Sequence, residues 1–278
     1  MEIRKTNVQL DDELSRMEEY FINDAYTNFE RHIEEDISLE PSINGQYGCS
    51  DLFKETFHEY SYSKETRGRY NTIVHNSASA LAGLYFERLA KDPEIEKCVI
   101  ITGVPGAGKT FFIQALALSS QFGSDTMIFE GDVTGNHMID KINLLKENGK
   151  ELLLIVINPT LELAQRNVIE RFYTIGRGAT PELMARIISR IPEGVKRLHD
   201  MFDIELGIFN KTSNHDVTYS IGIEHIDELN HGTEEQVLFL EAMKGTEDLM
   251  TMAVFVNREL LQTALKVFLQ NMVLIFLK

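Results

Sequence analysis

The chain has no tryptophan, only two cysteines and six prolines among 278 residues, and far fewer basic than acidic side chains. Cys49 and Cys98 are too few for a disulfide framework, which excludes a small disulfide-rich secreted scaffold and favours a reducing cytoplasm. The 27 Lys and Arg against 43 Asp and Glu give a net charge of −16. Such a charge argues against broad binding of nucleic acid or of an anionic membrane surface.

Long apolar runs are also missing. The N-terminus, MEIRKTNVQL, has basic residues without the apolar run of a secretory signal behind them. The C-terminal stretch VFLQNMVLIFLK is too short to span a bilayer, and Gln270 and Asn271 interrupt it. We expect it to form a helix docked on the core, with a membrane-surface or partner-binding tail as the alternative. With 43% hydrophobic residues, the chain is expected to be a soluble cytoplasmic protein.

The most informative stretch present is CVIITGVPGAGKT, which fits the Walker A pattern G-x-x-x-x-G-K-[ST]. Gly103, Gly106 and Gly108 allow the tight turn that points backbone N–H groups at phosphate oxygens. We expect Lys109 to contact the β and γ phosphates and the Thr110 hydroxyl to bind Mg²⁺. The predicted nucleotide-binding residues are Gly103, Val104, Pro105, Gly106, Ala107, Gly108, Lys109, Thr110 and Phe111.

Strand and helix patterns alternate around this loop. The runs TMIFEGD and ELLLIVIN predict short buried strands, and HMIDKINLLKENGK between them predicts a helix that ends at Gly149. FFIQALALSS, which follows the loop, is apolar nearly all round, as in a helix buried against a sheet. The alternation predicts an α/β fold of the P-loop NTPase or kinase type, a parallel sheet flanked by helices.

Further along the chain, Asn158 and Pro159 predict a helix start, and Gly176 predicts its end. The stretch RGATPELMARIISRIPEGVKRLHDMF predicts two helices divided at Pro192. IELGIFN predicts a strand and DVTYSIGI a last strand, with helices after Thr233.

The N-terminal part predicts helices with an acidic surface. Apolar residues from Leu10 to Ile33 recur every three or four positions, which predicts one acidic amphipathic helix. A second stripe begins near Tyr70 and ends at Pro93, and a loop is expected at EPSINGQYGCSD. The expected organisation is an acidic helical N-terminal segment (1–66), a P-loop kinase-like core (67–210), and a C-terminal strand with a helical extension packed on the core (211–278).

Charged residues at the ends of these elements are the candidate catalytic groups. Glu130 and Asp132 end the strand TMIFEGD, at the edge where ligands bind in open α/β sheets. Either carboxylate can hold Mg²⁺ through water or take a proton from an attacking hydroxyl. Arg171 near its helix end and Arg177 beyond the following glycine are expected to form a lid that stabilises a transferring phosphoryl group.

Two nucleotide-dependent classes are disfavoured. A motor or switch ATPase normally has an acid at the end of the strand beside the loop, where ELLLIVIN has Asn158. Guanine recognition requires an aspartate at the position of Ser213 in NKTS, so ATP is the expected nucleotide.

The ordered set FEGD, INP, VIERF, GRGATPE, LHDMFDI and FN, behind the Walker loop, resembles the zeta toxins of bacterial epsilon/zeta toxin–antitoxin systems. Zeta toxins are P-loop kinases that phosphorylate UDP-N-acetylglucosamine and block peptidoglycan precursor synthesis. The resemblance implies an ATP- and Mg²⁺-dependent kinase with a UDP-amino sugar acceptor and an antitoxin partner. It implies that Lys109 and Thr110 serve ATP and Mg²⁺, that Glu130 matches the acid of the family's Glu-Gly strand end, and that Arg171 and Arg177 match its two arginines.

One segment of the family pattern is missing. In the family, a strand with the catalytic aspartate and a sugar-binding helical segment precede the Glu-Gly strand, whereas here only FFIQALALSSQFGSD fills that interval. No residue matches the family's base; Asp132 and Asp125 are the candidates to replace it, and the N-terminal part is an alternative source of the acceptor site. The other two interpretations of the N-terminal part are a helical lid that inhibits the kinase and a helical layer that completes the core. The alternative functions are an ATP-binding switch or protein-interaction module with little kinase activity, and a nonspecific ATPase.

Overall fold

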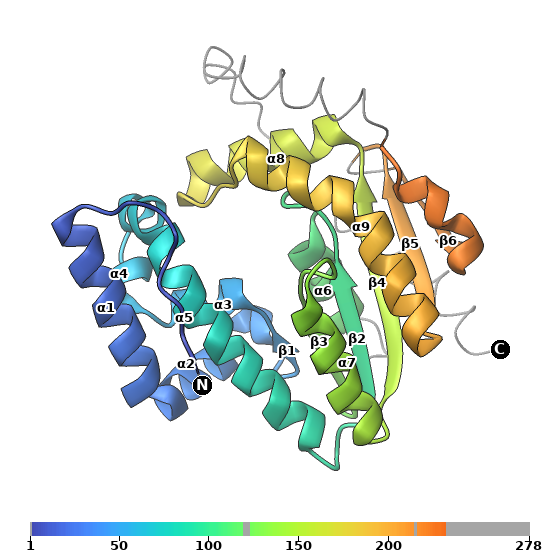
Figure 1. Ribbon diagram of the computed structural model, residues 1–278, viewed down its shortest axis with the longest axis horizontal. Helices are drawn as coiled ribbons and strands as arrows, with labels where there is room; N and C mark the ends of the chain where they lie inside the picture. Colours follow the sequence, from blue (N-terminus) through green and yellow to red (C-terminus); the bar gives the residue numbers. More distant parts are fainter. Residues whose placement is uncertain (1, 119–122, 214–215, 232–278) are drawn as a thin grey trace.

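The computed structural model describes residues 2–118, 123–213 and 216–231, and its centre is a six-stranded sheet (Figure 1). The strand order is β1-β3-β2-β4-β5-β6, with every neighbouring pair parallel except β5 and β6. This arrangement confirms the predicted α/β fold with a parallel sheet flanked by helices. The strands are β1 (Tyr47–Gly48), β2 (Lys97–Thr102), β3 (Thr126–Glu130), β4 (Glu151–Pro159), β5 (Glu205–Lys211) and β6 (Val217–Ile221).

Helices cover both faces of the sheet because its central strands are apolar on both sides. On one face, Phe86, Met138 and Val195 pack with the strands in a single core. On the other face, Phe112 and Ala164 belong to a second core. The first core is built by α5 (Lys64–Lys91), α7 (Asn136–Glu147), α9 (Pro181–Phe202) and the 3₁₀ segment η2 (Ile223–Leu229); the second by α3 (Ser50–Glu55), α6 (Lys109–Ala117), α8 (Leu161–Ile175) and the first part of α9.

A third core joins the N-terminal helices to α5, which lies between α1 and the sheet (Figure 1). Phe21, Phe53, Phe57 and Leu81 are fully buried in it. The helices of this layer are α1 (Asp12–Thr27), α2 (Phe29–Ser38), α3, α4 (His58–Ser61) and α5.

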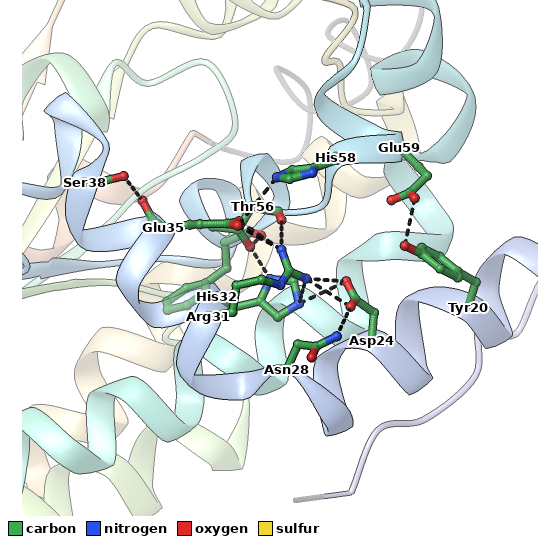
Figure 2. Close-up of polar contacts among 11 residues, drawn as sticks. Tyr20, Asp24, Asn28, Arg31, His32, Glu35, Ser38, Thr56, His58 and Glu59 are labelled. Atoms are coloured by element: carbon green, nitrogen blue, oxygen red, sulfur yellow. Dashed lines mark hydrogen bonds and ion pairs between the residues drawn. The ribbon is translucent and has the colours of Figure 1, made fainter.

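Polar contacts also tie the same layer together (Figure 2). Arg31 of α2 lies 2.8 Å from an Asp24 carboxylate oxygen of α1 and 3.0 Å from Glu35. The His32 ring contacts the Thr56 hydroxyl at 2.6 Å, which links α2 to the residue after α3. The N-terminal segment is therefore built as one packed layer with α5.

Two predictions for the N-terminal part were wrong in detail. The single helix expected from Leu10 to Ile33 is divided at Asn28, whose backbone leaves the helical region at φ −118° and ψ 34°. Its side chain donates to Asp24, a local hydrogen bond that competes with the helix. The loop expected at EPSINGQYGCSD contains the 3₁₀ segment η1 (Glu40–Ser42), strand β1 and the start of α3.

Two proline-based predictions were also wrong. Pro159 ends β4 instead of starting α8, and Thr160 caps the helix by accepting from the Leu163 N–H. Proline has no N–H to donate to a neighbouring strand. On the β2 side this costs no hydrogen bond, because β2 ends opposite Val156 and does not reach Pro159. Pro192 lies inside one continuous helix, α9, because buried Ile191 and Val195 hold the turns on either side of it against the sheet.

Across the described ranges, no helix combines the length and apolar character that a membrane crossing requires. The helices expected after Thr233, including the apolar stretch VFLQNMVLIFLK, lie outside the described residues. The strand expected at DVTYSIGI is β6, and the helix end expected at Gly176 is confirmed by its left-handed conformation.

Candidate nucleotide and phosphoryl-transfer site

The Walker loop connects β2 to α6 at the carboxyl edge of the sheet, and its glycines have positive φ angles of +146° (Gly103), +81° (Gly106) and +87° (Gly108). A Cβ atom would lie 2.4 Å from the Ile157 carbonyl oxygen at Gly103 and 2.2 Å from the Ala164 carbonyl oxygen at Gly106. Only glycine fits such positions, so strand β4 and helix α8 dictate the shape of the loop.

Lys109 begins α6 and bends back into this loop. Its Nζ donates to the carbonyl oxygens of Gly103 at 2.9 Å and Val104 at 3.2 Å, and lies 3.5 Å from Glu130 Oε1. Thr110 follows with an exposed side chain. A cation, a carboxylate and a hydroxyl therefore share this edge, and Phe111 lies half-buried beside them.

Glu130 ends β3 and is fixed by a residue of the N-terminal part. The Tyr47 hydroxyl of β1 donates to Glu130 Oε2 at 2.7 Å. Gly48 pairs with Phe129, so Cys49 comes next to Glu130 at the sheet edge. Burial raises the pKa of the Cys49 thiol, and the nearby carboxylates of Glu130 and Asp51 raise it further. The contacts of β1 thus bring a second acid, Asp51, to the same edge.

The two predicted arginines meet on that second acid. Arg171 Nη2 of α8 lies 3.2 Å from Asp51 Oδ2, and Arg177 Nη2 contacts the same oxygen. Arg177 Nη1 lies 3.4 Å from Glu55 Oε1. The chain turns between the arginines at Gly176, where a Cβ atom would lie 2.1 Å from the Lys64 carbonyl oxygen of α5. This close approach requires glycine and directs Arg177 back toward α3.

Asp51 lies in the first turn of α3 and is held in a mainly cationic cluster. Burial opposes ionisation of its carboxyl group, but Lys54, Arg177 and Arg171 outweigh burial and hold the pKa of Asp51 well below its usual range. Four cations face two carboxylates, which leaves a surplus of two positive charges. The members are Asp51, Lys54, Glu55, Arg67, Arg171 and Arg177.

The other candidate acids lie in different surroundings. Both Asp132 carboxylate oxygens accept local hydrogen bonds, from the Thr134 N–H at 2.8 Å and from its hydroxyl at 2.9 Å, and the residue is exposed. Asp125 lies at the amino end of β3, 3.3 Å from Lys97, at the opposite sheet edge from the Walker loop. Asp125 is therefore badly placed to act on a nucleotide in that loop.

Asp51 was not predicted from the sequence. It follows a strand of only two residues, Tyr47–Gly48, which is too short for any apolar alternation. It also precedes the Walker loop, whereas the family pattern led us to look for the acid after it. The sequence held one sign of this site. In YGCSDLF, Ser50 and Asp51 stand directly before the apolar pair Leu52 and Phe53, a pattern typical of the start of a helix.

Two side-chain oxygen groups near Lys109 suit a magnesium ion. Mg²⁺ is usually bound by one or two protein oxygens together with substrate phosphates and water. The Thr110 hydroxyl and the Glu130 carboxylate fit this donor set and flank Lys109. Within the described ranges, no group of three or more His, Cys, Asp or Glu side chains could hold a metal without such a substrate.

No protein-family model matches the chain, and no curated protein matches it. Several solved structures resemble it distantly. The PezAT chromosomal toxin–antitoxin system of Streptococcus pneumoniae is 11% identical, with a TM-score of 0.44, over 89% of this chain and 100% of that one. The AvrRxo1-ORF1:AvrRxo1-ORF2 complex with sulphate ions is 10% identical, with a TM-score of 0.40, over 87% and 90%. At these values the likeness assigns no activity to this chain.

Proposed function

We propose that this protein is a zeta-toxin-like kinase that transfers the γ-phosphoryl group of ATP to a hydroxyl of a small molecule. One observation carries the proposal: Arg171 and Arg177 converge on Asp51 at the sheet edge that also holds the Walker loop. Two guanidinium groups and a carboxylate are the set that phosphoryl transfer to a hydroxyl needs. The guanidinium groups stabilise the charge on the transferred group, and the carboxylate accepts the hydroxyl proton.

The nucleotide would be bound by the loop from Gly103 to Gly108, through its backbone N–H groups and the start of α6. In this role Lys109 exchanges its contacts with the loop carbonyl groups for the β and γ phosphates. Thr110 and Glu130 would hold Mg²⁺, which neutralises phosphate charge when bound. Tyr47 keeps Glu130 in place by its hydrogen bond.

Asp51 is the base in this proposal. The acceptor oxygen attacks the γ-phosphorus, the bond to the β–γ bridging oxygen breaks, ADP leaves, and the hydroxyl proton passes to Asp51. The resemblance places such an acid between the Walker helix and the Glu-Gly strand, where no residue of this chain matches it. Strand β1 lies beside β3 at the sheet edge and supplies an acid from the N-terminal side. This position favours a substrate-binding role for the start of α3 over a purely structural layer.

The acceptor is the finer part of the proposal. A surplus of two positive charges around Asp51 favours an acceptor that carries phosphate groups. A UDP-amino sugar, UDP-N-acetylglucosamine, has such a diphosphate next to free hydroxyl groups. We therefore propose this acceptor, together with a cytoplasmic toxin–antitoxin role and an antitoxin protein as partner.

The test is mass spectrometry of a bacterial metabolite extract enriched in UDP-sugars, incubated with ATP, Mg²⁺ and protein. We expect a UDP-amino sugar that gains one phosphoryl group with the wild-type protein but not with Lys109→Ala. Lys91→Ala is the matched control, since Lys91 is exposed and pairs only weakly with Glu87 at 3.7 Å. A different phosphorylated metabolite retains the kinase and rejects the acceptor. ATP binding without any phosphorylated product rejects the kinase and favours an ATP-binding switch.

A further inference from the structure

Lys54 is a buried cation whose individual role is not explained by its share of the positive charge around Asp51. Its side chain belongs to α3, and the residue is 4% exposed. The Nζ atom lies 3.2 Å from Asp51 Oδ1, three residues earlier on the same helix, and donates to Asn71 Oδ1 of α5 at 2.9 Å. A buried ammonium group is costly unless it is paired, so these two partners account for its presence.

The two oxygens of Asp51 have different partners. Oδ2 contacts Arg171 and Arg177, which come from α8 and from the segment after it. Oδ1 contacts Lys54, whose backbone is in the same helix as Asp51 and packs on α5 through Phe53. When the arginines turn to a transferred phosphoryl group, they have to leave Oδ2, whereas Lys54 can remain on Oδ1.

We propose that Lys54 is a positioning residue that holds Asp51 Oδ1 and keeps this carboxylate ionised and oriented while the arginines bind the phosphoryl group. This inference rests on the proposed kinase function. Departure of the arginines from Oδ2 would free that oxygen to receive the hydroxyl proton. Asn71 of α5 assists Lys54 in this role, because its amide oxygen accepts a hydrogen bond from the lysine and holds it in place.

The charges around Asp51 are set by several elements. Besides Lys54, its carboxyl group is faced by Arg171 and Arg177 and lies near the titratable groups of Cys49, Tyr60 and His75. His75 is exposed on α5, but desolvation by the surrounding protein and then the Lys54 charge lower its pKa, so this imidazole favours the neutral form. Burial raises the pKa of Tyr60 and also that of Cys49. Lys54 and the two arginines are therefore the basic groups that face Asp51; burial lowers the pKa of Lys54, and the Asp51 carboxylate opposes that shift.

The experiment compares Lys54→Gln, which keeps a hydrogen-bonding side chain and loses the charge, with Lys54→Arg and with the exposed control Lys91→Gln. Carboxyl ¹³C NMR follows the titration of Asp51, assigned with Asp51→Asn. Steady-state kinetics give kcat and the KM for ATP from the lowest pH at which the protein stays folded up to pH 8. Asn71→Leu is a second variant with Lys54 intact, in case loss of the buried charge prevents folding.

We expect the Asp51 titration to move up by about one pH unit in Lys54→Gln, because an adjacent opposite charge shifts a carboxyl group by about 1–3 units. We also expect the acid limb of the kcat profile to move up by the same amount, with kcat at pH 8 and the KM for ATP changed less than about twofold. Lys54→Arg should restore most of the activity, and Asn71→Leu should give a smaller change in the same direction.

The inference is overturned if the Asp51 titration and the shape of the pH profile are the same in Lys54→Gln as in Lys91→Gln. A lower kcat alone would then reflect a structural role. Failure of the proposed function is a separate result: the unsubstituted protein would phosphorylate no acceptor. The NMR titration requires no acceptor and still decides whether Lys54 holds Asp51.

Discussion

Replacement of Asp51 by asparagine tests the proposed base most directly. The amide has nearly the same shape, but it cannot accept a proton from the attacking hydroxyl. A positioned general base contributes about 10²–10⁴ in rate, so we expect kcat to fall by that factor. This corresponds to a rise of about 3–5 kcal/mol in the activation free energy. The KM for ATP should stay unchanged or fall, because the cationic surplus of the cluster rises by one charge.

The cost in stability is smaller and can be separated from the kinetic effect. Asp51→Asn leaves Lys54, Arg171 and Arg177 without this carboxylate, although Asn71 still accepts from Lys54 and Glu55 still pairs with Arg177. Loss of one member of a buried pair costs about 3–5 kcal/mol. The Asp51 side chain is 39% exposed, so water compensates part of this loss, and we expect about 1–3 kcal/mol in the free energy of unfolding. Chemical denaturation measures this value independently of turnover.

The assay measures ADP release and acceptor phosphorylation together, with Asp132→Asn as the matched acid. Asp132 lies in a local turn with both oxygens occupied by Thr134, so its replacement should change kcat less than about threefold. Asp51 is not the base if Asp51→Asn retains kcat within about threefold, or if Asp132→Asn lowers kcat as much as Asp51→Asn does.

Three further predictions concern the Walker loop, the Glu130 carboxylate and the buried carboxyl group of Asp36. Gly106→Ala places a Cβ atom 2.2 Å from the Ala164 carbonyl oxygen, so calorimetry should show ATP affinity reduced at least about tenfold; unchanged binding would contradict the loop assignment. Tyr47→Phe removes the donor to Glu130, and kcat should fall about tenfold with folding retained; an unaltered kcat would show that this hydrogen bond is not needed. Burial raises the pKa of Asp36 to about 7. The folded protein therefore keeps a proton that the unfolded chain releases near pH 4, and stability falls as the pH rises from about 4 to about 7. Asp36→Asn should accordingly stabilise the protein by up to about 4 kcal/mol at pH 8 and by little at pH 4 in urea denaturation, and equal effects at both pH values would refute this.

The parts of the site that could be predicted from the sequence are those with a strict local requirement. The Walker loop needs glycine at fixed positions, and Gly106 faces Ala164 so closely that no other residue fits. Gly176 likewise ends α8 with a left-handed turn against α5. Such requirements are visible in sequence spacing because they arise from backbone geometry.

The parts that were missed depend on packing between distant segments. Pro192 normally ends a helix, but α9 continues through it because the apolar residues on both sides are buried against the sheet. Strand β1 exists because the edge of β3 is available to pair with it, and two residues carry no periodic signal of their own. Local propensity could not show either result, since the neighbouring element decides both.

The order of elements along the chain differs from the order in which they meet at the site. Parallel strands bring their carboxyl ends to one edge of a sheet, so an acid can reach that edge from before or after the Walker loop. Here Asp51 precedes the loop and Arg171 and Arg177 follow it, while α5 connects the two parts. The same helix carries Asn71 and buries Phe53 of α3. The N-terminal layer therefore places Asp51 at this edge, and substitution at Asp51 or Lys54 tests the proposed catalysis more cleanly than removal of the layer.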